Sequence, residues 1–152
     1  MALITQTQVI DAPIDRVFDT VIDVGNYAAW NPTITASRRL DEGELRDGSR
    51  FEWQLKGFGT VILEFQEFER NARVRIVLQT RWYSGGHRFL FSAQGRATRI
   101  DHELETTPRG ILRLLGPMIA WSGRRNLRQT VEALQTYIEG TRPALPRTTR
   151  GL

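Results

Sequence analysis

The chain contains two histidines, His87 and His102, and these are the residues best suited to chemistry. Imidazole exchanges a proton most readily near neutral pH, so either histidine could serve as a general acid or base. Both fall on the apolar side of an alternating segment and are therefore expected to face a core. The alternative is that each is a core histidine held by one hydrogen bond, because buried polar groups usually have a partner.

Other kinds of catalytic site lack the residues that they need. The chain has no cysteine, which excludes disulfides and redox chemistry at sulfur. Two histidines without an inward carboxylate fall short of the protein ligands that a catalytic zinc requires. The sequence has no GxGxxG, GxxxxGK or HExxH motif and no serine nucleophile elbow, so nucleotide-dependent and hydrolytic reactions lack support. We therefore predict no metal and no cofactor.

The histidines belong to a region, residues 34–107, in which apolar residues recur at every second position. This period predicts half-buried β-strands. Residues 57–59 predict a hairpin connection, and residues 84–86 predict a later turn. With residues 3–10 and 34–41, the runs make seven strands. The positions that share the apolar parity are Phe51, Trp53, Leu55, Val61, Leu63, Phe65, Val74, Ile76, Leu78, Trp82, His87, Phe89, Phe91, Ile100, His102 and Leu104.

Apolar residues at helical spacing mark further segments. Residues 14–23 carry one apolar stripe behind Pro13, a typical first helical residue, and Gly25 is expected to end this helix. Residues 26–32 end on a proline and allow only a helical turn or two. Residues 111–139 form the longest pattern, with a kink or interruption expected at Gly116 and Pro117. The apolar face of this last helix is small in its first half and large in its second.

Length and composition fit one domain. The 152 residues, 40% of them hydrophobic, allow a sizeable core, which we expect to span residues 1–140 before a flexible tail, 141–152, rich in Arg and Pro. Three of the 21 basic residues lie after Glu139, so the other 18 nearly balance the 17 acidic ones. We therefore predict no nucleic-acid binding. No apolar run is long enough to span a bilayer, so we expect a cytoplasmic protein without stable membrane insertion.

The order of these segments is strand, two short helices, six strands and a long closing helix, which indicates an α+β fold with an antiparallel sheet. The opening IDAPIDRVFDTVIDVGNYAAWNP, the strand GRATRIDHELE and the final amphipathic helix resemble the polyketide cyclase/dehydrase branch of the START-like, or SRPBCC, superfamily. The resemblance covers residues 3–140. It implies a helix-grip fold, in which a curved seven-stranded antiparallel sheet surrounds the long C-terminal helix.

The inward parity of the strands and the apolar face of the last helix predict the wall of an internal cavity, since the opposite parity is charged. Small residues on the helix above an aromatic-rich sheet leave space for a ligand. The alternative is that the aromatic side chains fill this space. The predicted ligand-binding wall is Trp53, Leu55, Leu63, Phe65, Ile76, Leu78, Trp82, Phe89, Phe91, Ile100, Leu104, Ile119, Ala120, Gly123 and Leu127.

Tyr27, Trp30 and Asn31 are expected where the second helix meets the mouth of the cavity. They could form an aromatic gate with one amide donor. An equally good interpretation is that the aromatic rings pack the helix on the sheet and that Asn-Pro belongs to an ordinary turn. Arg81 and Tyr83 could contact a polar ligand end at the rim, although such residues are more often solvated strand ends.

The predicted function is binding of a small hydrophobic or aromatic molecule, such as a lipid or a polyketide-like compound, in the internal cavity. The alternative is a cyclase- or dehydratase-like enzyme in which His87 or His102 moves a proton on an enolisable substrate. A third hypothesis is a protein-interaction module that works through its surface and its tail. The scarcity of polar groups on the inward parity favours a binding protein over an enzyme. We expect a monomer or a homodimer.

Overall fold

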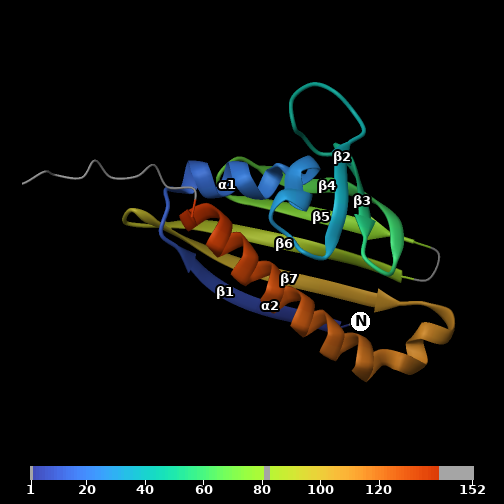
Figure 1. The fold of residues 1–152 in the computed structure, drawn as a ribbon. Coiled ribbons are helices and arrows are strands. Elements are labelled where there is room, and N and C mark those ends of the chain that lie inside the picture. The colour runs from blue at the N-terminus through green and yellow to red at the C-terminus, as the bar shows by residue number, and fades with distance from the viewer. Residues whose placement is uncertain (1, 81–82, 141–152) are drawn as a thin grey trace, which may run out of the picture.

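In residues 2–80 and 83–140, which the computed structural model describes, seven antiparallel strands form one curved sheet (Figure 1). Their order across the sheet is β1-β7-β6-β5-β4-β3-β2, so consecutive hairpins build it from β2 to β7 and β1 pairs with β7 at the other edge. The predicted α+β helix-grip fold is confirmed. The strands are β1 (Ala2–Ile10), β2 (Ile34–Arg39), β3 (Arg50–Leu55), β4 (Gly59–Glu69), β5 (Arg73–Gln79), β6 (Tyr83–Gln94) and β7 (Ala97–Pro108).

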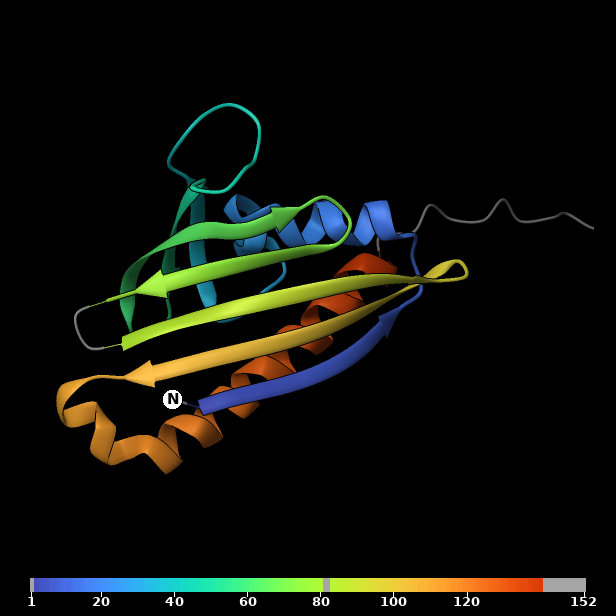
Figure 2. The ribbon, with the colours of Figure 1, turned by 180° about the vertical axis from the view of Figure 1, so that it is seen from behind.

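Both α-helices lie against one face of the sheet, which we call the concave face (Figure 1). The view from behind shows the strands in front of both α-helices (Figure 2). α1 (Ile14–Ile22) and the 3-10 helix η1 (Val24–Ala29) follow β1, and the 3-10 helix η2 (Gly110–Leu115) leads into α2 (Gly116–Gly140). The parity that faces the helices is the apolar one, because burying the charged parity without partners would be costly.

α1 begins after Pro13 as predicted but ends earlier than expected. Its last residue is Ile22, because Asp23 leaves the helical conformation with φ −77° and ψ 58°. Gly25 therefore does not end α1 but lies within η1. Its lack of a side chain serves a close contact, since a Cβ there would lie 3.2 Å from the backbone nitrogen of Arg39 in β2.

The turn predicted at residues 84–86 is also wrong. These residues belong to β6, where Gly85 pairs with Leu78 and Gly86 pairs with Val77 of β5. The chain reverses between Gln79 and Tyr83 instead. Glycine inside a strand often marks a close approach of other groups. A Cβ on Gly85 would lie 2.6 Å from the hydroxyl oxygen of Tyr83, so this glycine leaves room for the tyrosine ring.

The predicted interruption of the C-terminal helix is confirmed. η2 ends at Leu115, and α2 starts at Gly116 with Pro117 in its first turn, where a missing N–H is harmless. The second half of α2 buries one face, through its large apolar residues Val131, Leu134 and Ile138. Contacts of α2 with strands are mainly to β1 and β7.

The buried apolar side chains of the described chain form two clusters. The larger cluster joins the concave face to α1, η1 and the C-terminal end of α2, where it includes Leu134 and Ile138. The smaller cluster contains Leu104, Leu127 and Val131. Buried His102 lies between Ile100 of the larger cluster and Leu104 of the smaller one along β7.

Candidate functional site

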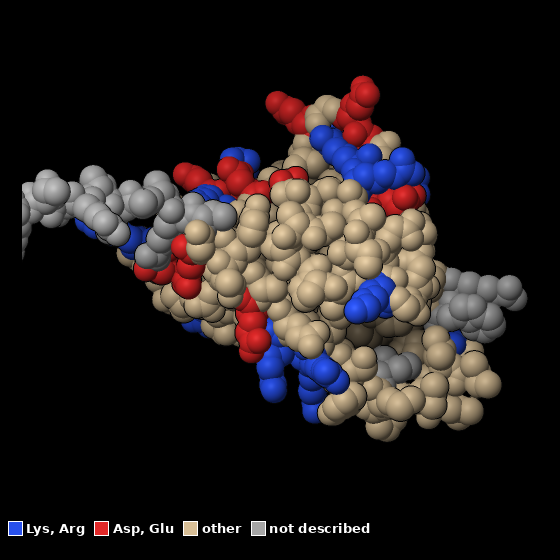
Figure 3. Space-filling model, in the orientation of Figure 1, with Lys and Arg blue, Asp and Glu red and all other residues tan. Residues whose placement is uncertain are grey.

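The inward side chains at one end of the concave face retain accessible surface. Leu55, Leu78 and His87 are half-buried, whereas the next inward residue on each of these strands, further from this end, is buried: Trp53, Ile76 and Phe89. The space-filling view shows a hollow between the main body and the lobe formed by η2 and the start of α2 (Figure 3). We call this part of the concave face the open end.

The strand register decides which residues meet at the open end. Gly85 pairs with Leu78 on one side and with Thr106 on the other. In the next row, His87 pairs with Leu104. These cross-strand partners share one face of the sheet, since directly opposed residues point the same way. The first of these rows, at the open end, therefore combines a leucine, a glycine and a threonine: Leu78, Gly85 and Thr106.

The two histidines are in direct contact. His87 Nδ1 lies 2.9 Å from His102 Nε2, because His102 is the diagonal neighbour of His87 across β6 and β7. The His102 ring also stacks on Phe89, with ring centroids 4.1 Å apart. The pair thus forms a polar point in an aromatic wall. Both histidines face inward as the sequence predicts.

Burial sets the charge of this pair. It lowers the pKa of His87 to about 4. Burial and then the charge of His87 hold the pKa of His102 well below its usual range. Both rings are therefore neutral at pH 7, and either one donates the shared proton, depending on the tautomer. A neutral imidazole whose pKa is near 4 is a weak general base at pH 7, which favours hydrogen bonding over proton abstraction.

Two further polar groups lie near the histidines: Thr106, which the sequence interpretation did not name, and Tyr83, which it named only as a residue of the rim. Thr106 is buried on the parity of His102, and its Oγ1 has no hydrogen-bond partner in the described part of the chain. Tyr83 is half-buried on the parity of His87, and burial raises the pKa of its hydroxyl. The alternating region predicted at residues 34–107 contains Thr106 on the inward parity, but its hydroxyl was not counted as part of the wall. The turn predicted at residues 84–86 hid the parity of Tyr83, which the alternation of β6 shows when it is continued back from His87.

The α2 side of the open end differs from the prediction at Gly123. A Cβ at this position would lie 3.2 Å from Ile4 Cδ1 and 3.7 Å from Leu104 Cδ2. The missing side chain thus brings α2 close to β1 and β7 and leaves no space at that point. Leu127, one turn later, is buried against Leu104. The side chains of Ile119 and Ala120, and all of Trp82, lie outside the described part of the structure.

The other end of the concave face is filled by protein side chains. Phe91 meets Phe18 of α1 edge to face, with ring centroids 5.1 Å apart. Phe65 stacks on Phe68 in the same region. Further residues of the predicted wall are buried in the larger cluster, namely Leu63, Ile76 and Ile100. These side chains already have apolar partners, so space for a ligand is to be sought at the open end.

The residues predicted at the cavity mouth have structural partners. Tyr27 is buried and its hydroxyl donates a hydrogen bond to the Val21 carbonyl. Its ring lies between those of Trp30 and Trp53, at centroid distances of 4.6 and 5.1 Å. Asn31 Oδ1 accepts hydrogen bonds from the backbone and the hydroxyl of the Thr33 residue that follows the turn. This geometry matches the packing and turn interpretation.

A depression of about 490 Å³ lies elsewhere, between α1, η1 and the end of α2. Carboxylates of α1 and the Trp30 and Tyr137 rings line it. Asp19 is paired with Arg70 at 3.0 Å, and Asp15 accepts a hydrogen bond from Asn71 at 2.6 Å. These carboxylates already have partners. The depression is lined by charged residues and by no inward strand residue, so it is not the predicted apolar cavity.

Comparisons with known proteins agree with this architecture. The family model described as "Polyketide cyclase / dehydrase and lipid transport" matches residues 1–139. A START superfamily protein from Mycobacterium smegmatis is 18% identical with a TM-score of 0.79, over 91% of this chain and 97% of that chain. The Zhui aromatase/cyclase from Streptomyces sp. R1128 is 16% identical with a TM-score of 0.74, over 91% and 93%. At these identities the structures show a shared fold. No curated protein matches the chain.

Proposed function

Because the chain belongs to the polyketide cyclase/dehydrase and lipid transport family, we propose that it binds a small, largely apolar molecule at the open end of the concave face. The observation that supports this most is the contact of two neutral histidines, at 2.9 Å, within an apolar wall that stays partly accessible. Such a wall with a few convergent polar groups is typical of small-molecule sites.

The polar groups suggest how the ligand would be oriented. In the described residues no other hydrogen bond reaches either imidazole, so His87 Nε2 and His102 Nδ1 have no protein partner. A neutral histidine can donate or accept, which suits a carbonyl or hydroxyl group on the ligand. The Thr106 hydroxyl, which has no hydrogen-bond partner among the described residues, offers a second point of attachment. The apolar body of the ligand would then contact Leu55, Leu78 and Leu104.

Ligand binding can be tested without knowing the natural ligand. Solvent extraction and mass spectrometry of the purified protein, with titration by the neutral fluorophore N-phenyl-1-naphthylamine, should reveal occupancy or binding. Leu78→Trp should weaken binding at least about tenfold, because the indole fills the open end at a cost above ~1.4 kcal/mol. Val77→Trp is the matched control, since Val77 points to the other face of β5. Equal binding by the two variants would contradict the proposed site.

A cyclase- or dehydratase-like reaction is the second candidate, and the histidine contact is the observation that favours it. Two imidazoles sharing one proton could pass it to or from an enolisable substrate. The low pKa of His87 weakens the case at neutral pH. The test is conversion of an identified ligand by wild-type protein and by His87→Gln/His102→Gln. Equal conversion by both proteins would show that the histidines take no part in the reaction.

A further inference from the structure

Exposed apolar side chains are concentrated where α2 begins. Of nine large apolar side chains that are exposed in the described chain, five lie within residues 111–121. We call these five the η2–α2 patch: Ile111, Leu114, Leu115, Met118 and Trp121, with exposed fractions of 71, 81, 42, 59 and 63%. η2 buries none of its residues. Scattered exposed apolar residues are ordinary, but a contiguous group marks a contact surface.

The helix continues this surface with positive charge. Met118, Trp121, Arg125 and Arg128 follow one another at intervals of three or four residues, so they share one face of α2. The guanidinium carbon of Arg125 lies 5.9 Å from the centre of the Trp121 ring. All of these side chains are exposed. The face therefore passes from apolar to basic along the helix axis.

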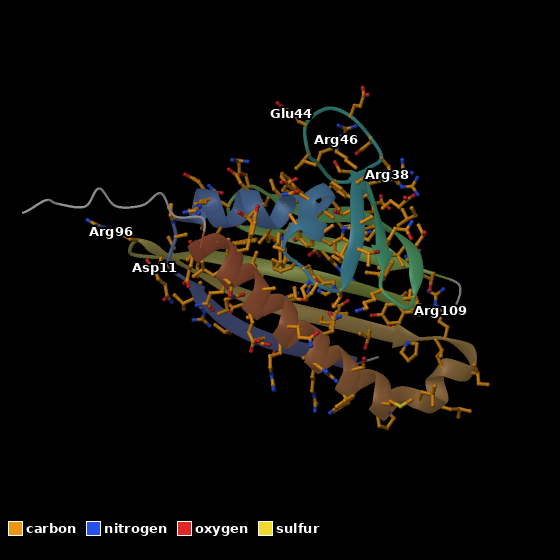
Figure 4. The ribbon with its side chains drawn as sticks, viewed as in Figure 1. Asp11, Arg38, Glu44, Arg46, Arg96 and Arg109 are labelled. Carbon is orange, nitrogen blue, oxygen red and sulfur yellow. The ribbon has the colours of Figure 1, made fainter. Side chains whose placement is uncertain are left out.

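The charge around the patch has one sign. The sequence between Glu105 and Glu132 contains five arginines and no acidic residue. The five are exposed, and in the sequence they lie before, within and after the patch: Arg109, Arg113, Arg124, Arg125 and Arg128. Arg109 lies at the end of the molecule where η2 begins (Figure 4). In the space-filling view the lobe is free of acidic side chains on the face shown, with basic side chains beside it along α2 (Figure 3).

We propose that the η2–α2 patch binds the surface of an anionic lipid bilayer. Apolar side chains that include a tryptophan enter the interface between headgroups and acyl chains, and arginines beside them pair with lipid phosphates. A second copy of the chain fits less well, because a symmetric contact through the patch would bring arginines against arginines. None of the described helices is long and apolar enough to cross a bilayer. This inference is independent of the proposed ligand site.

The test is co-sedimentation of the full chain with vesicles of phosphatidylcholine alone or with an equal amount of phosphatidylglycerol. Binding is expected to the anionic vesicles, weakening as salt is added. Arg124→Gln/Arg125→Gln should reduce it up to about 30-fold, from about 1 kcal/mol for each arginine near an anionic surface. Met118→Gln/Trp121→Gln should reduce it at least about tenfold, because both apolar side chains are withdrawn from the interface.

Matched control variants test whether vesicle binding depends on this surface or only on the overall charge and hydrophobicity of the protein. Arg46→Gln/Arg96→Gln removes the same charge from positions far from the lobe (Figure 4) and should leave binding unchanged, as should Phe58→Gln, whose side chain is 59% exposed. Equal loss in the control variants would overturn the proposal, as would equal binding to neutral vesicles. The proposal would also be overturned if the wild-type protein did not bind vesicles and light scattering showed it to be a dimer, with the Met118→Gln/Trp121→Gln variant a monomer. Fluorophore binding at the open end should persist in every variant.

Discussion

Acidification should destabilise the protein through the histidine pair. The pKa of His87 is lowered from 6.5 to about 4 by burial, so the unfolded chain takes up a proton at a higher pH than the folded protein does. The free energy of unfolding is therefore greatest above pH 6.5 and falls as the pH drops from 6.5 towards 4. Below that interval the loss from His87 is complete, at no more than about 3 kcal/mol.

The loss is best measured between pH 7 and pH 5. Over this interval His87 alone should lower the free energy of unfolding by up to about 2 kcal/mol. This is an upper value, because His87 is half-buried and solvent reduces the penalty. The pKa of His102 is lowered in the same direction, so its contribution adds to that of His87. Carboxylates with lowered pKa values, such as Glu52 and Glu67, also lose stability on acidification, but they titrate at lower pH.

Urea unfolding followed by circular dichroism at pH 7, 6 and 5 measures this loss. The difference between wild type and His87→Gln/His102→Gln isolates the histidines, because the carboxylates are common to both proteins. The wild-type unfolding free energy should fall more steeply, by about 2 kcal/mol over the interval. If the two proteins lose stability in parallel, the histidines are not held neutral by burial. The single variants, His87→Gln and His102→Gln, should each show a smaller fall of the unfolding free energy with pH than the wild type does.

Three other substitutions test the packing around the site. Gly123→Ala should raise the free energy of unfolding by about 0.5–1 kcal/mol, because alanine favours a helix and its Cβ meets only side-chain tips, Ile4 Cδ1 at 3.2 Å and Leu104 Cδ2 at 3.7 Å; a lower urea midpoint would show that these side chains cannot shift. Gly85→Ala should lower it by about 1–3 kcal/mol, since the new Cβ would lie 2.9 Å from the backbone oxygen of Glu105 as well as 2.6 Å from the Tyr83 hydroxyl; an unchanged melting temperature would contradict this clash. Tyr27→Phe should cost about 1–2 kcal/mol in urea unfolding, because a buried carbonyl of α1 loses its donor; no loss would show that another donor replaces it.

The sequence alone determined the strands, the helices and the face that each strand buries. These features depend on neighbouring residues: alternation at period two predicts a half-buried strand, and a stripe at helical spacing predicts an amphipathic helix. The break at Gly116 and Pro117 was predictable for the same reason, since the backbone of proline restricts its own turn. Two local predictions were wrong where a glycine serves packing. Gly25 and Gly85 allow close approaches to groups distant in the chain. From the sequence, a glycine indicates only that the backbone is free to turn, and not which group approaches it.

The tertiary structure decided which inward residues meet. The contact of His87 with His102 depends on the register of β6 against β7, and a shift by one residue would turn one of them to the other face. The same register places Thr106 beside Gly85 and so adds a hydroxyl to the site. The packing of α1 and α2 determined which part of the wall is filled and which part stays open. Alternation specifies a side of the strand, whereas position along and across the sheet is a property of pairing between segments far apart in the chain.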